Sequence, residues 1–319
     1  MCAECYHRGP MDIALVGEKI RPEDWLPRLR ARLPQDRFFV HPETPDPKSI
    51  AVALVAAPRA GEVAQLPNLK LMQCLWMGVD ALLLDRTLPR GVPVARMVDP
   101  SMVKAMTETV LHRVIDFHRG FHTYRRQQAE RRWAHLRQHM ASDRTVGILG
   151  LGELGADAAA KLVALGFKVR GWSRSKKSLP GVDCHAGEDG LAAMLPECDM
   201  VICLLPLTPQ THGLLAKPLL DRMKQGSALI SLARGAQMAT ADVIAALDSG
   251  RLVHAYLDVF EEEPLPPGHP LWARPDVSIT PHIAALTEPR TALEVVAENV
   301  ERVRRGETPL HLVDFGAGY

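Results

Sequence analysis

The sequence predicts an α/β protein of two domains, each built on a parallel sheet. The chain has 319 residues, which exceeds one ordinary hydrophobic core and fits two domains of roughly 100–200 residues each. Short apolar runs alternate with helical patterns along most of its length, as expected when helices connect parallel strands. Apolar residues make up 47% of the chain and charged residues 24%, proportions that are typical of a globular protein in water.

Composition also indicates which binding partners and which cellular compartment to expect. A net charge of +1 gives no reason to expect nucleic acid or a membrane surface as a partner. No apolar run approaches the roughly 20 residues that span a bilayer, and no secretory signal opens the chain. Cys2 and Cys5 have the spacing of a metal or redox pair, but nothing completes a zinc site. We therefore expect a loose leader over residues 1–10, no metal site, and a cytoplasmic protein with reduced thiols.

The first domain is expected between Met11 and about residue 100. Four apolar runs separated by Pro- and Gly-containing turns predict strands at 13–16, 52–57, 69–76 and 92–98. A long helix should follow, because apolar residues recur at steps of three or four, at Val103, Met106, Val110, Val114 and Phe117. Residues 125–133 read as a charged, solvated face.

The second domain is expected to contain six more strands: TVGIL, KVRGW, DMVICLL, SALISL, VHAYLDV and VSIT. Helical segments lie between most of them, which predicts βαβ units and a parallel sheet. In ATADVIAALDSG, for example, Thr240 is expected to cap a helix that Gly250 ends.

A G-x-G-x-x-G motif occupies the turn after TVGIL. Alone the motif is weak, but here it joins a strand to a strong helix-forming segment, which is the context of a dinucleotide-binding turn. Gly150 would allow the tight turn, Gly152 the approach of a pyrophosphate, and Gly155 close packing of the helix. Glu153 and Leu154 lie between Gly152 and Gly155 and would contact the cofactor as part of the same turn. We expect the helix to begin at Gly155 and to offer free N–H groups to the phosphates.

The end of the next strand favours NADPH over NADH. An NAD site has a carboxylate about 20 residues after the motif, whereas this chain has Ser173, Arg174 and Ser175 there, followed by two lysines. A guanidinium could pair with a 2′-phosphate, and no carboxylate would repel it. A basic surface turn is the plainer alternative, and NADH use stays possible.

Three further polar groups follow predicted strands, where ligands of such sheets bind. Arg234 follows SALISL, Glu261–Glu263 follows VHAYLDV, and His282 follows VSIT. Singly, each group could be an ordinary surface or structural residue. Together they supply an anion clamp, a proton donor and a carboxylate that favours the protonated imidazole.

These motifs resemble the D-isomer-specific 2-hydroxyacid dehydrogenases over nearly the whole chain from Met11. The resemblance rests on GILGLGELG, LARG, LDVFEEEPLP and TPHIAALT, and on WMGVD, CLLPLTPQT and WSRSKKSLPGV, which are most like the glyoxylate/hydroxypyruvate reductase A branch.

The resemblance implies an oxidoreductase that reduces small 2-oxoacids such as glyoxylate and hydroxypyruvate with NADPH. In it, Arg234 binds the carbonyl oxygen and carboxylate, His282 protonates the carbonyl, and Glu263, directly before a proline, binds His282. The backbone at Met77 and Gly78 cradles the substrate carboxylate, although Trp76 and Met77 stand where the family has small residues. Further cofactor contacts are implied for Leu205, Pro206, Thr211, Ala233 and Asp258, the last holding the nicotinamide carboxamide.

The implied architecture is a homodimer of chains with two Rossmann-like or flavodoxin-like domains and an active-site cleft between the domains. Residues 1–99 and 287–319 would form the discontinuous substrate domain and residues 100–286 the NADP-binding domain. A cofactor-sensing corepressor of the same fold and a dehydrogenase for a larger 2-oxoacid remain alternatives. Phosphoglycerate dehydrogenase and NAD-linked D-lactate dehydrogenase are less favoured, the first because no regulatory domain follows residue 319 and the second because of Ser173.

Overall fold

The structure, a computed structural model, describes residues 9–319; the Cys2/Cys5 pair lies outside this range. The chain forms two compact units, one made of the residues up to Met102 with Thr287–Tyr319 and the other of Val103–Leu286. The first boundary lies inside a helix that begins at Pro100, whereas the sequence placed it just before that helix. Both units are α/β with parallel sheets, so the predicted fold class is confirmed.

The first unit is built on a five-stranded parallel sheet in the order β2-β1-β3-β4-β5. This is the order of flavodoxin-like folds. The strands are β1 (Asp12–Val16), β2 (Arg37–Val40), β3 (Ile50–Val55), β4 (Leu71–Cys74) and β5 (Val94–Ala95).

Alternating apolar residues on these strands build the core of the first unit. Ala14 and Val16 on β1 and Ala53 and Val55 on β3 face one buried cluster, as the two-residue period of a strand requires. The helices of this unit are α1 (Pro22–Arg32), α2 (Asp80–Leu83) and α9 (Pro289–Arg305). Helix α9 packs against α1 and β4, so the end of the chain completes a core that its beginning started.

A buried amide pair joins α9 to this sheet. Asn299 is fully buried, and its Nδ2 donates to Oε1 of Gln73 on β4 at 2.7 Å. Its Oδ1 accepts from the N–H of Leu310 at 2.6 Å. One side chain thus satisfies buried polar groups on a strand and on the tail.

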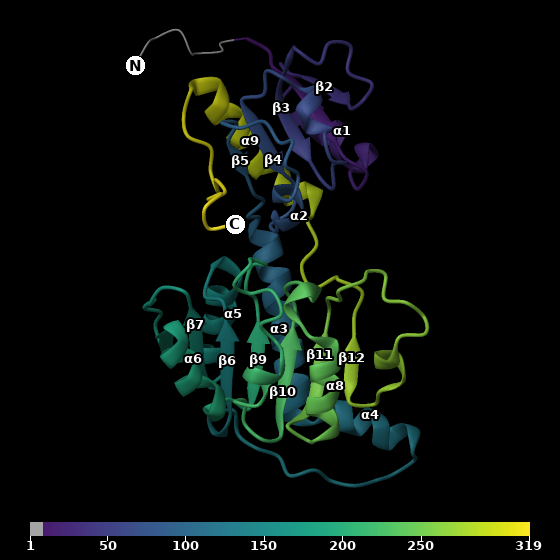
Figure 1. Ribbon diagram of the computed structural model, residues 1–319, viewed down its shortest axis with the longest axis vertical. Coiled ribbons are helices and arrows are strands. Elements are labelled where there is room, and N and C mark those ends of the chain that lie inside the picture. The colour runs from purple at the N-terminus through teal and green to yellow at the C-terminus, as the bar shows by residue number, and fades with distance from the viewer. Residues whose placement is uncertain (1–8) are drawn as a thin grey trace. The chain divides into compact units, whose positions relative to one another are not determined.

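The second unit is built on a seven-stranded parallel sheet in the order β12-β11-β10-β9-β6-β7-β8 (Figure 1). Counted from its first strand, this is the 3-2-1-4-5-6 order of a dinucleotide-binding fold with one more strand at the edge. The strands are β6 (Thr145–Leu149), β7 (Lys168–Ser173), β8 (Val182–Ala186), β9 (Met200–Cys203), β10 (Ser227–Ser231), β11 (Leu252–Leu257) and β12 (Val277–Ile279).

Helices cover both faces of this sheet. Residues of α3 and α5 pack on one face against Ile202 and Ile230, and residues of α6, α7 and α8 pack on the other against Val201 and Leu229. Because both faces are buried, the central strands read as continuous apolar runs. The helices are α3 (Pro100–Arg119), α4 (Phe121–Ala129), α5 (Glu153–Ala164), α6 (Gly187–Met194), α7 (Lys217–Leu220) and α8 (Thr240–Asp248).

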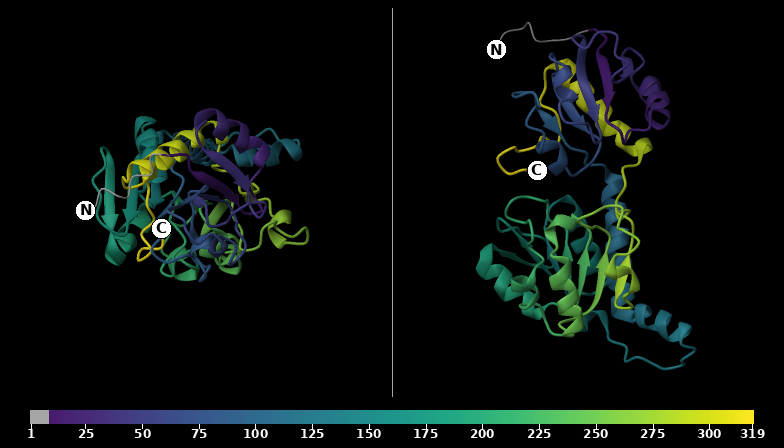
Figure 2. Two further views of the ribbon diagram at one scale, coloured as in Figure 1. Left: turned by 90° about the horizontal axis from the view of Figure 1, so that it is seen from above. Right: turned by 45° about the vertical axis from the view of Figure 1, so that its right-hand side comes forward.

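Short 3-10 turns complete the list of elements, at Val63–Gln65, Ala141–Asp143, Leu195–Glu197, Gly235–Gln237 and Pro270–Ala273. Helix α4 and the irregular stretch after it extend beyond the sheet of the second unit (Figure 2). Of the charged segment 125–133, only the part up to Ala129 is helical.

Two edge strands and two helix starts differ from the prediction. The sequence analysis predicted neither β2 nor β8. Strand β2 is a short edge strand, and β8 has the mixed sequence VDCHA with no fully buried residue. Neither strand therefore shows a strong apolar alternation. Helix α5 begins at Glu153 rather than Gly155, and Ala239, not Thr240, is the N-cap of α8. Helix ends depend on backbone geometry that sequence patterns mark only within a residue or two.

The part of the chain that the structure describes has no helix that is both long and apolar enough to cross a membrane.

Replacing Asn299 with Ala should destabilise the protein. The change leaves the buried Gln73 oxygen and the Leu310 N–H without their partner, and each such group costs about 1–3 kcal/mol. Urea unfolding followed by circular dichroism measures the loss.

Glu294→Ala is the matched control on the same helix. Its side chain is 63% exposed and pairs with Arg32, and an exposed ion pair is worth at most about 1 kcal/mol. An Asn299→Ala variant no less stable than this control would show that the buried amide pair contributes little.

Candidate active site

The predicted site residues of the second unit lie at one edge of its sheet. Paired residues run in a single row across six strands, from Trp172 on β7 through Leu149, Cys203, Ser231 and Leu257 to Ile279 on β12. Each predicted ligand-binding segment begins within a few residues of this row. The carboxyl ends of parallel strands are where such sheets bind ligands.

The three glycines of the motif have three different surroundings. Gly150 has a φ of +105°, which L side chains rarely adopt, and a Cβ there would lie 2.8 Å from the carbonyl oxygen of Leu204. A Cβ on Gly155 would collide with the carbonyl oxygen of Gly150. Nothing lies within 4 Å of the place where Gly152 would carry a Cβ. The turn therefore packs tightly on two sides and is open at Gly152.

The open glycine is also the N-cap of α5. Glu153, Leu154 and Gly155 occupy the first turn of the helix, where backbone N–H groups lack partners within the helix. The positive end of the helix dipole is at the same place. An open glycine beside free N–H groups is suited to binding a phosphate.

The turn after β7 is held by its own serine. Ser173 is 9% exposed, and its Oγ donates to the carbonyl oxygen of Ser175 at 2.8 Å. Trp172 Nε1 donates to the carbonyl oxygen of Gly187 at 2.8 Å. Arg174 and Ser175 are exposed beyond this anchored strand end, so the basic segment lies on the ligand edge of the sheet.

The loop after β9 is joined to Arg234 by Gln237, a residue that the sequence did not single out. Gln237 is fully buried; its Nε2 donates to the carbonyl oxygens of Leu205 and Pro206, both at 3.1 Å. Its Oε1 accepts from the N–H of Arg234 at 3.2 Å. Thr211 Oγ1 donates to the carbonyl of Pro206 at 2.7 Å and closes the loop.

Arg234 follows β10 and is half-buried, beside the buried Ala233. Its Nη1 donates to the carbonyl oxygen of Ala233 at 2.7 Å. The next residue, Gly235, lies so close to the backbone of Phe260 that any Cβ would collide with it. This contact places the Arg234 segment directly against the segment that follows β11.

Glu263 and His282 form a hydrogen-bonded pair. Glu263 Oε2 lies 2.7 Å from Nδ1 of His282, and its Oε1 accepts from the N–H of Phe260 at 2.8 Å. The carboxylate is therefore fixed to the backbone that Gly235 contacts. Of the three consecutive glutamates, the structure places Glu263 against the imidazole, and 45% of the His282 side chain is exposed.

Asp258 lies directly after β11 and is 1% exposed. Its Oδ1 accepts from Thr280 Oγ1 at 2.6 Å and from the N–H of Ile283 at 3.0 Å, and its Oδ2 accepts from the N–H of Ala284 at 2.9 Å. The donors surround His282 on both sides in the sequence. Thr280, the last residue of the run VSIT, is a second contact that the sequence analysis missed, although a polar residue ending an apolar strand is a visible signal.

Met77 and Gly78 belong to the first unit, in the turn between β4 and α2. Both are partly buried, and the Trp76 side chain before them is 37% exposed. The carbonyl oxygen of Trp76 accepts from the N–H of Met97 at 3.0 Å, which ties this turn to the chain after β5.

A buried polar network lies behind the site, between α3, α4 and β11. Asp116 accepts two hydrogen bonds from Arg125, at 2.6 and 2.9 Å, and one from Tyr256 Oη at 2.6 Å. Burial alone would raise the pKa of Asp116, but these hydrogen bonds outweigh it and hold that pKa below its usual range. Burial lowers the pKa of His254, next on the same strand face, to about 3. The network is thus an ion pair of Asp116 and Arg125 bonded to Tyr256, which lies two residues before Asp258.

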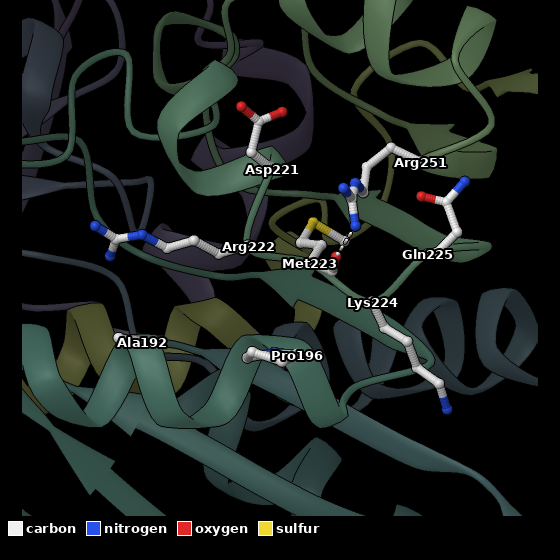
Figure 3. A pocket seen from close by; sticks show the side chains of 8 residues that line it. All are labelled: Ala192, Pro196, Asp221, Arg222, Met223, Lys224, Gln225 and Arg251. Carbon is white, nitrogen blue, oxygen red and sulfur yellow. Dashed lines mark hydrogen bonds between the residues drawn. The ribbon is translucent and has the colours of Figure 1, made fainter.

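The opposite edge of the sheet carries an open hollow of about 620 Å³ (Figure 3). Its basic residues lie before β10 and β11 and already have partners: Arg222 pairs with Glu188, Lys224 Nζ lies 2.9 Å from Asp199, and Arg251 Nη1 donates to a backbone carbonyl at 3.1 Å. Strands begin at this edge, where parallel sheets rarely bind ligands, so we assign it no function.

The edge with Arg234, Glu263 and His282 combines a cationic group, a hydrogen-bonded imidazole and open backbone N–H groups. Acid-assisted addition to a carbonyl group requires a cation that stabilises the negative charge developing on oxygen and a proton donor that neutralises it. A guanidinium and an imidazole can supply these two functions. Residues 9–319 contain no group of three metal-ligating side chains that could hold an ion.

Comparison with known proteins identifies the family of the chain. Residues 111–284 match the NAD-binding domain of D-isomer specific 2-hydroxyacid dehydrogenases, so the chain belongs to that family of oxidoreductases, as its motifs predicted. Glyoxylate/hydroxypyruvate reductase A of Serratia proteamaculans (strain 568) is 41% identical over 97% of this chain and 100% of its own.

Two solved structures of the family are also similar over nearly the whole chain. One, from Xanthobacter autotrophicus Py2 in complex with NADPH and MES, has a TM-score of 0.94 and 41% identity and covers 98% of this chain and 100% of its own. The other, an NADPH-dependent glyoxylate/hydroxypyruvate reductase from Sinorhizobium meliloti with NADP and sulfate, has a TM-score of 0.91 and 35% identity and covers 97% of this chain and 100% of its own.

Proposed function

We propose that this protein reduces small 2-oxoacids, such as glyoxylate and hydroxypyruvate, to 2-hydroxyacids with NADPH. The observation that carries the proposal is the His282–Glu263 pair at 2.7 Å, joined through the Phe260 backbone to the Arg234 segment. The reductases named above support the substrate class. Neither the site nor these relatives favour a cofactor-sensing role.

The residues present fit NADPH. The open side of Gly152 and the N–H groups of the α5 first turn suit a pyrophosphate. Arg174 and Ser175, exposed after β7, suit a 2′-phosphate. We assign the loop held by Gln237, with Leu205, Pro206 and Thr211, and Ala233 to the rest of the cofactor. Bound NADPH supplies the hydride that the reaction requires.

The chain's own residues then act on the substrate. Arg234 would bind the carbonyl oxygen and the carboxylate and stabilise the negative charge that develops on oxygen. His282 Nδ1 is held by Glu263, so Nε2 is the atom left to donate a proton to that oxygen. Backbone N–H groups at Met77 and Gly78 would bind the substrate carboxylate.

We further propose that the enzyme is a cytoplasmic homodimer. Cys184, Cys198 and Cys203 are thiols outside any disulfide, as is usual in a reducing compartment. The homodimer is inferred from the family resemblance alone.

The primary experiment is NADPH oxidation with a panel of glyoxylate, hydroxypyruvate, pyruvate and phenylpyruvate. Turnover of the first two supports the proposal. Preference for phenylpyruvate would indicate a larger substrate, and no turnover of any 2-oxoacid would contradict the proposal.

His282→Asn should lower kcat by about 10²–10⁴, the usual contribution of general acid catalysis, while NADPH affinity stays nearly unchanged. Steady-state kinetics and NADPH fluorescence titration measure the two quantities. His112→Asn, an exposed histidine on α3, is the matched control. A loss of kcat below about threefold in folded His282→Asn would remove His282 from the mechanism.

Arg234→Lys should also fail although it keeps the positive charge. A planar guanidinium can bridge two oxygens, whereas an ammonium group is a point charge, and misplacing an oxyanion donor costs about 10²-fold or more. We expect that drop in kcat/KM, and none in Arg251→Lys at the opposite edge. Kinetics near wild type for Arg234→Lys would reduce Arg234 to a surface charge.

Arg174→Ala should weaken NADPH much more than NADH. A charge-assisted hydrogen bond is worth roughly 1.5–3 kcal/mol, or about 10- to 150-fold. Ser173→Asp should act in the same direction, because a carboxylate repels the 2′-phosphate and can accept from the ribose hydroxyls. The measurement is kcat/KM for both cofactors, with Arg222→Ala at the opposite edge as control. Equal losses for NADPH and NADH, or a wild-type preference for NADH, would contradict the phosphate pocket.

A further inference from the structure

His282 has an unusual backbone conformation. Its φ is +53°, a left-handed conformation that non-glycine residues seldom adopt. Its neighbours Pro281 and Ile283 are exposed, so side-chain packing does little to hold this turn. A proton donor must nevertheless be held close to its productive geometry, because a displacement of about 1 Å can cost 10²-fold in rate.

The Asp258 carboxylate supplies the missing support. It accepts from Thr280 Oγ1 before His282 and from the N–H groups of Ile283 and Ala284 after it. The Asp258 carbonyl oxygen also accepts from the N–H of His282, at 2.8 Å. Residues on both sides of the left-handed position are therefore bonded to one buried residue at the end of β11.

Arg113 on α3 fixes the direction of the threonine bond. Its Nη2 donates to Thr280 Oγ1 at 3.2 Å, and a guanidinium can only donate. Thr280 must therefore use its own hydroxyl hydrogen for Asp258. The guanidinium also lies 5.6 Å from the centre of the Tyr256 ring, so it is held in turn by the strand that carries Asp258.

We propose that Asp258 and Thr280 are positioning residues that hold the main chain of His282 in the conformation needed to donate its proton. This inference rests on the proposed reductase function. It assigns Asp258 a role different from the contact with the nicotinamide carboxamide that the family resemblance implies, and the two roles affect different quantities. A carboxamide ligand governs cofactor affinity, whereas a positioning residue governs turnover.

Three variants separate these roles. Asp258→Asn keeps the shape but replaces one acceptor oxygen with an N–H donor that faces other donors. Thr280→Val removes only the hydroxyl, and Thr280→Ser restores it. Ser278→Ala is the matched control, because Ser278 lies on β12 two residues before Thr280 and its hydroxyl bonds to His254 at 2.9 Å, not to Asp258.

Each variant of the full chain is measured in three ways. NADPH titration without substrate gives the cofactor Kd, steady-state kinetics give kcat and KM, and hydrogen exchange by mass spectrometry gives the protection of residues 281–286. We expect Asp258→Asn to lower kcat by about 10²-fold and Thr280→Val by a smaller factor, with NADPH Kd within about threefold of wild type. Thr280→Ser should recover most of the loss.

Amide exchange should report the loss of support directly. Exchange in 281–286 should be faster in Asp258→Asn and Thr280→Val and unchanged in Ser278→Ala.

Opposite results overturn the proposal. A weakened NADPH Kd with unchanged exchange would make Asp258 a cofactor ligand, and equal effects in Thr280→Val and Ser278→Ala would make Thr280 an ordinary structural residue. If Asp258→Asn does not fold, the valine and serine variants at 280 decide. If wild type reduces no 2-oxoacid, the proposed function fails, while the exchange data still decide whether Asp258 holds this segment.

Discussion

The register of the parallel sheet in the second unit is the constraint on which the site depends. Trp172, Leu149, Cys203, Ser231, Leu257 and Ile279 are paired partners in one row. Because all six strands run in the same direction, the segments that follow them leave the sheet at one edge. A one-residue slip of any strand would turn its side chains to the opposite face, and both faces of this sheet are buried under helices.

Close backbone approach converts that edge into a site. Gly155 packs on Gly150, and Gly235 packs on Phe260, with no room for a Cβ in either contact. The first contact closes the turn after β6, and the second brings the segments after β10 and β11 closer than side chains would allow. In the segment after β11, Glu263 accepts from the Phe260 N–H and reaches His282, so the pair is held against the segment that carries Arg234.

Two buried carboxylates hold the elements that carry the exposed His282 in place. Asp258 and Asp116 are both buried, and each is bonded to several donors, as a carboxylate removed from water requires. The network at Asp116 fixes α3 and α4 to Tyr256, and the bonds of Asp258 fix the turn that carries His282. An imidazole that is 45% exposed is thus supported by polar groups that are almost completely buried.

The sequence determined the family, the α/β class and nearly all the central strands, because these features are local. Apolar runs marked the strands buried on both faces, and the G-x-G-x-x-G motif marked a turn whose geometry few other residues allow. It also predicted that Arg234, Glu263 and His282 share one edge, since the carboxyl ends of parallel strands must.

Tertiary structure decided what depends on contacts between distant residues. The edge strands β2 and β8 have no strong apolar pattern, because a strand at an edge is stabilised by its neighbour and exposed on one side. The start of α5 at Glu153 depends on the close packing of Gly155 against the turn. The partners of Gln237, Gly235 and Thr280 were set only when the register of β9 to β12 placed them side by side. A hydrogen bond between residues far apart in the chain leaves no periodic signal, because its geometry is set by the packing of whole elements and not by the spacing of residues.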